Sequence, residues 1–184
     1  FTRIISDIRT YSDTPIGVQL GHAGRKASTS APWKGGRALG ADEGAWETFS
    51  ASAAAFKDDW HTPTAMTQGD MDRVVAAFED AARRADRAGF DLVELHAAHG
   101  YLLTQFLSPL SNHRTDDFGG SYENRARFPL RAAQALRDAW PRTKALGVRF
   151  NGPDWTGGGI TPDEAAGFGQ ALHAMGYDLS LIPI

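Results

Sequence analysis

Two histidines and a tyrosine follow a short apolar run and form the strongest candidate for a site in the chain. Residues 95–101 read Leu-His-Ala-Ala-His-Gly-Tyr and come directly after the run at residues 90–94. Imidazoles can donate hydrogen bonds or exchange protons, and a phenol can supply a proton. Parallel sheets often hold such side chains at strand ends, where the following loop turns them toward a cavity. The pattern therefore predicts a site at the end of a buried strand.

Four β-rich runs alternate with helical patterns and are typical of parallel βαβ units. The expected strands are residues 16–20, 90–95, 146–150 and 177–182. The first long helix is expected to begin after Thr67, with Asp70 completing a capping box, and to end at Gly89. The last is expected to begin at Thr161, with Glu164 as the capping-box acid, and to end at Gly176.

The helix between these two is expected to begin near Ser121 and to run toward Trp140, where Pro141 stops it. Pro129 conflicts with this pattern, because proline lacks the N–H of the helical ladder. Either the helix is kinked at Pro129, or it begins later than Ser121.

The composition is that of an ordinary globular protein: 42% of the 184 residues are hydrophobic, 22% are charged, and the formal net charge is −3. No basic excess or Lys/Arg run is present, so neither nucleic acid nor a membrane surface is expected as a partner. The lack of cysteine excludes disulfides and thiolate metal sites in these residues. No apolar stretch approaches the ~20 residues that span a bilayer, and the N-terminus is not a signal peptide. These features predict a cytoplasmic location.

Four strands and three crossover helices do not close a barrel, because a (β/α) barrel of eight units takes roughly 250 residues. The chain is therefore either a small open sheet or the middle of a larger barrel. Residues 21–60 contain Trp33, Trp46 and Trp60 without a sustained period, which indicates a long loop over one rim of a scaffold. Together with the lack of an initiator methionine, this favours a single partial barrel domain over residues 1–184, truncated at both ends.

Three motifs resemble the old yellow enzyme family of FMN-dependent ene-reductases, in the same order and spacing. They are QLGHAGRKAS from residue 19, HAAHGYLL from residue 96 and FLSPLSNHRTDDFGGSYENR from residue 106. The Lys26-Ala-Ser-Thr run, with Pro32-Trp33 and Gly35-Gly36, further resembles the bacterial, xenobiotic-reductase-like branch. The resemblance implies a parallel (β/α)8 TIM barrel with FMN at the carboxyl ends of its strands. This chain would supply strands 3 to 6.

The resemblance also implies roles for the residues at the strand end. Reduced FMN would give a hydride from N5 to the β-carbon of an α,β-unsaturated carbonyl compound, and Tyr101 would supply a proton to the α-carbon. A phenol suits this role because it stays protonated at neutral pH. His96 and His99 would hydrogen-bond the carbonyl oxygen, as an oxyanion hole does. A metal site is the competing interpretation of two histidines, but no third ligand has metal-binding spacing, so no metal is predicted.

Two polar residues near the ends of other strands complete the predicted site. By the resemblance, Gln19 contacts the pyrimidine edge of FMN, and Arg149 lies on its N1/O2 side, where a positive charge favours the anionic reduced flavin. Arg149 alone could equally form an internal ion pair. NADPH or NADH would be the hydride donor. His22, Arg25 and Lys26 receive no definite role, and residues 108–125 are expected to hold the helix that follows. His113, in that loop, is expected to be structural or to face solvent.

The sequence departs from the family pattern in several places. The first two and last two strands of the barrel, with most of the FMN phosphate site, would lie outside these residues. Asn151, Gly152, Pro153 and Thr104 are less usual, and the ending from Asp178 lacks the expected Ser/Gly-rich continuation.

Two alternatives to the ene-reductase interpretation stay open. One is a dienoyl-CoA reductase-like flavoenzyme with a distal iron-sulfur cluster. The other is a non-catalytic half-barrel that associates through exposed sheet edges as a homo-oligomer.

Overall fold

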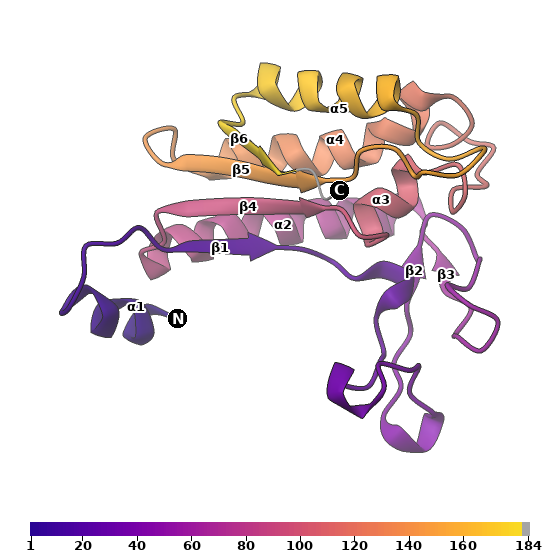
Figure 1. Ribbon diagram of the computed structural model, residues 1–184, viewed down its shortest axis with the longest axis horizontal. Coiled ribbons are helices and arrows are strands. Elements are labelled where there is room, and N and C mark those ends of the chain that lie inside the picture. The colour runs from indigo at the N-terminus through magenta and orange to yellow at the C-terminus, as the bar shows by residue number, and fades with distance from the viewer. Residues whose placement is uncertain (182–184) are drawn as a thin grey trace.

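A parallel four-stranded sheet forms the centre of the molecule (Figure 1). The computed structural model describes residues 1–181. The strands are β1 (Gly17–Leu20), β4 (Leu92–Ala97), β5 (Ala145–Phe150) and β6 (Leu179–Leu181), and they pair in the order β1-β4-β5-β6. All four predicted strands are therefore confirmed, with ends shifted by one or two residues. Residue 182, the expected end of the last strand, lies outside the described residues.

Three long helices connect the strands as predicted: α2 (Gln68–Ala88), α4 (Tyr122–Ala139) and α5 (Pro162–Met175). The hydroxyl oxygen of Thr67 accepts a hydrogen bond from the backbone N–H of Asp70, which confirms the cap of α2. Thr161 and Glu164 form the same capping box at α5. Gly89 and Gly176 end these helices in the left-handed conformation, with φ of 94° and 90°.

Helix α4 begins where the capping residue Ser121 places it, and Pro129 lies inside it. The alternative of a later start is therefore wrong. Pro129 removes one donor from the helical ladder, but Phe128 and Ala132 beside it are fully buried. The helix continues through Pro129 because this apolar face packs on the sheet.

The structure also contains several shorter elements. Helix α1 (Thr2–Arg9) precedes β1, and the short helix α3 (Leu102–Leu107) follows β4. Residues 21–60 leave the carboxyl end of the sheet as a long excursion (Figure 1), as expected for a rim loop. They hold the 3-10 turns η1 (Gly24–Lys26), η2 (Pro32–Lys34) and η3 (Ala41–Glu43). Strand β2 (Phe49–Ser50) of this excursion pairs with β3 (Thr64–Ala65).

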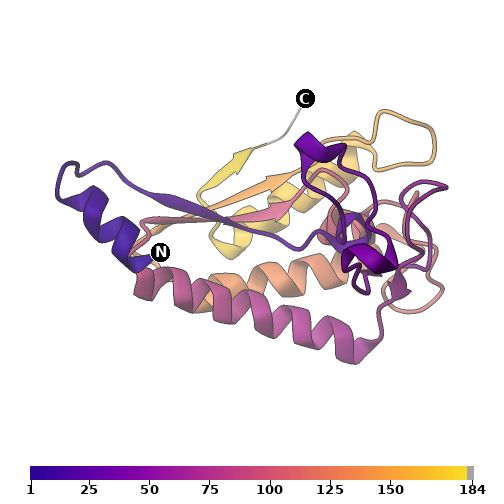
Figure 2. The same cartoon turned by 90° about the horizontal axis from the view of Figure 1, so that it is seen from below.

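In the described chain, α2, α4 and α5 cover one face of the sheet, and we call the opposite side the open face (Figure 2). Val93, Leu95 and Val148 are buried on the covered face, in one apolar cluster with side chains of the helices. Side chains alternate between the two faces along a strand. Glu94 and His96 therefore lie on the open face.

Strand register brings polar side chains of three strands together on the open face. Gln19 of β1 lies opposite Glu94 of β4, and His96 of β4 lies opposite Arg149 of β5. The strands are parallel, so their carboxyl ends meet at one edge of the sheet. The predicted site residues consequently share one face and one end of the fold.

Candidate active site

The two histidines and the tyrosine gather where β4 ends. His96 belongs to the strand and is 4% exposed, His99 lies in the following turn, and Tyr101 is the N-cap of α3. Nε2 of His96 lies 3.3 Å from Nδ1 of His99. The rings of Tyr101 and His96 meet edge to face, with centroids 5.0 Å apart and planes at 86°. The structure thus brings together the three residues that the sequence predicted as a catalytic group.

The surroundings favour neutral imidazoles at both histidines. Burial lowers the pKa of His96, and the neighbouring His99 and Arg149 lower it further. Burial also lowers the pKa of His99, with added contributions from the positive charges of Arg149 and Lys26. A neutral imidazole keeps one N–H donor. The two facing nitrogens can therefore direct two uncharged donors at one oxygen atom, an arrangement that stabilises negative charge developing on a carbonyl oxygen.

Gln19 is exposed on the open face and is held by an acidic neighbour. Its side-chain amide donates a hydrogen bond to the carboxylate of Glu94. The contact uses an N–H of Gln19 and leaves its amide oxygen available as an acceptor. Glu94 was not predicted as a site residue, because it lies inside an apolar run. The sequence nevertheless carries a signal for it: Glu94 is a polar residue two positions before His96, and strand alternation places both side chains on the same face.

Arg149 of β5 lies opposite His96 in the sheet, and its Nε is buried without a hydrogen-bond partner. None of the ion pairs found within residues 1–181 includes Arg149. The internal ion pair considered from the sequence is therefore not formed there. Nδ1 of His96 is likewise buried without a partner. Buried polar groups of this kind are costly unless another group satisfies them.

These unsatisfied groups provide a test of whether the residues suit a flavin. A flavin ring has carbonyl oxygens and ring nitrogens that accept hydrogen bonds, together with an N–H that donates one. Arg149 offers the donors, and the free amide oxygen of Gln19 offers the acceptor. The residues at this edge of the open face therefore fit the polar edge of FMN.

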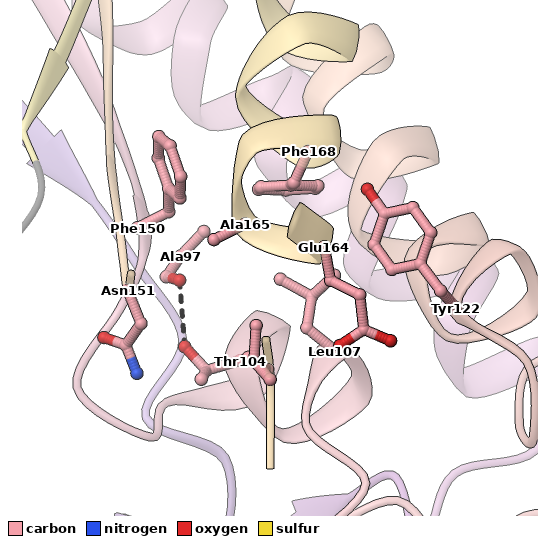
Figure 3. Close-up of a pocket in the computed structure, with 10 residues that line it drawn as sticks. Ala97, Thr104, Leu107, Tyr122, Phe150, Asn151, Glu164, Ala165 and Phe168 are labelled. Atoms are coloured by element: carbon pink, nitrogen blue, oxygen red, sulfur yellow. Dashed lines mark hydrogen bonds between the residues drawn. The ribbon is translucent and has the colours of Figure 1, made fainter. Parts of the chain in front are cut away.

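A small pocket lies on the covered face and contains none of these residues (Figure 3). Ala97 and Phe150 line it, and they alternate along their strands with His96 and Arg149. Its free volume is about 10 Å³, roughly the room that one water molecule needs. The Thr104 hydroxyl donates a 2.9 Å hydrogen bond to the Ala97 carbonyl oxygen across its wall. This pocket is a gap between the sheet and the helices packed on it, whereas the predicted site residues lie on the open face.

Other polar residues near the site are engaged locally. Nδ1 of His22 accepts a hydrogen bond from the N–H of Gly24, and Arg25 donates to two backbone carbonyls of the rim loop. His113 is exposed, as expected. Residues 1–181 place no group of three or more His, Cys, Asp or Glu side chains where they could hold a metal ion. Over the same residues, no helix is both long and apolar enough to cross a bilayer.

Fold and site together define a segment of a parallel (β/α)8 barrel enzyme, with its polar groups at the carboxyl ends of the strands. The family model described as the NADH:flavin oxidoreductase / NADH oxidase family matches residues 1–182, and the chain belongs to this family. The family consists of FMN-dependent oxidoreductases that use NADPH or NADH. The predicted resemblance, barrel fold and cofactors are thereby confirmed at the level of the family.

Individual relatives agree with this assignment. The chain is 40% identical over 162 residues to an NADPH dehydrogenase of Clostridium acetobutylicum, a match that covers 88% of this chain and 43% of the relative. Among solved structures, 2-naphthoyl-CoA reductase superposes with a TM-score of 0.80 at 28% identity, over 98% of this chain and 28% of that one.

Morphinone reductase in complex with tetrahydroNAD superposes with a TM-score of 0.77 at 29% identity. That match covers 98% of this chain and 52% of morphinone reductase. The chain spans less than half the length of the curated relatives that it matches.

Proposed function

We propose that the chain forms the substrate-facing and flavin-facing part of an FMN-dependent NAD(P)H oxidoreductase that reduces the C=C bond of α,β-unsaturated carbonyl compounds. The proposal rests on one observation: Nε2 of His96 and Nδ1 of His99 face each other at 3.3 Å. They do so on the open face, beside the ring of Tyr101.

The histidine pair would bind the carbonyl oxygen of an activated alkene. At 3.3 Å the two nitrogens share one weak contact, and an oxygen that accepts an N–H from each would replace it. Such an oxygen gains negative charge as the alkene is reduced, and two fixed donors stabilise that charge. Lowered pKa values keep both rings uncharged, so the oxygen is bound by hydrogen bonds and is not protonated.

Tyr101 would supply the proton for the α-carbon. Tyr101 follows His99 by two residues, and its ring packs against His96, so one of the two histidines that would bind the carbonyl oxygen also holds the phenol in place. A proton donor next to the bound carbonyl can reach the adjacent carbon without rearrangement.

The polar residues of the neighbouring strands would hold the cofactor. Arg149 would donate to the polar edge of the FMN ring, and the amide oxygen of Gln19 would accept a hydrogen bond from it. When bound and reduced by NADPH or NADH, FMN supplies the hydride for the β-carbon. Arg149 would stabilise negative charge on the ring, because a planar guanidinium is a charged donor of hydrogen bonds.

Replacing Tyr101 by phenylalanine tests the proton transfer. We expect Tyr101→Phe to lower the reduction of 2-cyclohexenone in the FMN-loaded protein by about 100-fold or more. Reduction of the flavin by NADPH should be unchanged. Tyr122→Phe is the matched control, because Tyr122 lines the pocket on the covered face (Figure 3). Unchanged alkene reduction in Tyr101→Phe would remove the residue from the donor role.

Titration of the 184-residue chain with FMN, followed by flavin absorbance and fluorescence, tests the cofactor site. Binding followed by bleaching with NADPH in the absence of oxygen supports an oxidoreductase. A chain that binds no FMN and elutes early in size-exclusion chromatography would favour the non-catalytic half-barrel, associated through the edges of β1 and β6.

A CoA-thioester substrate is a second candidate, because the solved structure of 2-naphthoyl-CoA reductase superposes over nearly the whole chain. The histidine pair would serve a thioester carbonyl by the same hydrogen bonds. Rates with crotonyl-CoA and with 2-cyclohexenone, measured side by side, separate the two substrate classes. A preference for the thioester of 100-fold or more would favour the CoA-dependent enzyme.

A further inference from the structure

The turn that carries His99 has an uncommon backbone conformation. His99 has φ of 57°, and Gly100, which follows it, has φ of 66°. The left-handed region is sparsely populated by residues with a β-carbon and persists only where the surroundings hold it. Something in the fold must therefore hold the His99 peptide.

Two side chains from segments that follow other strands hold the backbone of His99, one at its N–H and one at its carbonyl oxygen. The backbone N–H of His99 donates a 2.9 Å hydrogen bond to Oδ1 of Asn151, which directly follows β5. The carbonyl oxygen of His99 accepts a 2.7 Å hydrogen bond from Nζ of Lys26, which lies in η1 beyond β1. The ends of three neighbouring strands thus converge on this one residue.

Lys26 is itself held in place. Its ammonium lies 4.4 Å from the centroid of the Phe56 ring. At this distance a cation is attracted to the face of an aromatic ring. A β-carbon on Gly100 would lie 3.4 Å from the same nitrogen, in van der Waals contact, and the φ of 66° would strain any residue other than glycine. The rim loop, the turn and the ammonium therefore fit together as one unit.

We propose that Lys26 and Asn151 are positioning residues that clamp the His99 peptide and thereby aim Nδ1 of His99 at the point that Nε2 of His96 also faces. Neither residue was assigned a role from the sequence. The inference deepens the proposed function, because the clamp sets the geometry of the carbonyl-binding pair. Without it, the left-handed turn relaxes, and the second donor no longer converges with the first.

Amide hydrogen exchange tests the clamp without the cofactor or any substrate. In the 184-residue chain, Asn151→Ala and Lys26→Met should each speed exchange of the His99 amide by about tenfold, the effect of one lost hydrogen bond. Lys26 does not contact that amide. Faster exchange in Lys26→Met would therefore show that the two hydrogen bonds hold the same turn. Asn151→Asp and Lys26→Arg keep the acceptor and the donor, and they should restore slow exchange.

Lys57→Met is the matched control for charge. Lys57 lies 5.5 Å from the same Phe56 ring, so the variant removes a neighbouring cation but leaves the turn untouched. It should leave exchange of the His99 amide unchanged. Equal exchange in the parent chain, Lys26→Met and Asn151→Ala would overturn the clamp. If Lys26→Met does not fold, the comparison of Asn151→Ala with Asn151→Asp decides the question.

Kinetics of the FMN-loaded protein then show whether the clamp acts through His99. Lys26→Met should lower kcat/KM for 2-cyclohexenone by about tenfold. In a His99→Ala background the same change should have an effect below about twofold. An equal loss in both backgrounds would mean that Lys26 acts on substrate or flavin directly, and the clamp would be rejected as its role. If no variant reduces alkenes, the proposed function fails, whereas the exchange data still decide the clamp.

Discussion

The side-chain amide of Gln19, in β1, donates a hydrogen bond to the carboxylate of Glu94 on the neighbouring strand β4. The two residues are register partners, so the hydrogen bond joins side chains that the sheet already places opposite each other. It leaves the amide oxygen of Gln19 as the free acceptor at this position. Glu94 thus determines which end of the amide is available to a ligand.

Loss of the Glu94 carboxylate should weaken cofactor binding, although Glu94 need not touch the cofactor. In Glu94→Ala the amide of Gln19 is free to rotate, and we expect FMN to bind roughly threefold to tenfold more weakly. Glu94→Gln keeps an acceptor and should show a smaller loss. Fluorescence titration with FMN measures both, and Glu79→Ala on the outer surface of α2 is the control. Equal FMN affinity in Glu94→Ala and the parent would show that Gln19 does not need this partner.

Removal of the Arg149 guanidinium should change stability and cofactor affinity in opposite directions. Arg149→Met removes a buried donor that has no partner in the described chain, so the free energy of unfolding without FMN should be unchanged or higher. FMN affinity should fall by about tenfold or more, because a charged hydrogen-bond donor is lost. Urea unfolding and FMN titration of the same variant measure the two effects. A variant that loses stability and keeps FMN affinity would contradict the assignment of Arg149 to the cofactor.

Local signals in the sequence were sufficient to predict the framework. The strands were visible as apolar runs, and the capping boxes at Thr67 and Thr161 fixed the starts of α2 and α5. His96, His99 and Tyr101 could be grouped because they are close in the chain. The grouping of Gln19 with Arg149 depended on the family resemblance, since strand order cannot be read from spacing.

What the sequence missed depends on tertiary contacts. Every residue of α3 is buried, so this helix has no polar face and no helical period to detect. The contacts of Lys26 and Asn151 with His99 span 73 and 52 residues along the chain. Such contacts exist only once the strands are side by side.

Stability should fall in mild acid because folding lowers the pKa of three histidines. The pKa values of His96, His99 and His22 are lowered from 6.5, mainly by burial. A lowered pKa means that the unfolded chain takes up protons that the folded chain resists. This part of the stability is therefore fully present above pH 6.5 and is lost as the pH falls through the lower folded values. The urea midpoint should be lower at about pH 5.5 than at about pH 7.5.

Single variants can assign this pH dependence to particular residues. His96→Gln should flatten the dependence most, because His96 is the most buried partner of the pair. His113→Gln is the matched control, since His113 is exposed and lies away from the pair. A pH dependence that survives in His96→Gln and His99→Gln would point to other groups, His22 first among them.

The loop of residues 108–121 should depend on one buried arginine, Arg125, in the first turn of α4. Arg125 donates to the carbonyl oxygen of Gly120 at 3.0 Å, to that of Leu107 and to the carboxylate of Glu164. These bonds join the loop to α3 and α5. The side chains of the ion pair are only 5% and 21% exposed.

Arg125→Met should therefore destabilise the fold strongly, because it leaves Glu164 and two carbonyls without their donor. Breaking a buried pair of this kind costs about 3–5 kcal/mol. Arg131→Met is the matched control on the same helix. It breaks a pair with Asp72 whose side chains are 39% and 52% exposed, and such a pair contributes less than about 1 kcal/mol. Urea unfolding of the two variants gives the difference. Similar losses in both would mean that the loop is held by its backbone turns, and not by Arg125.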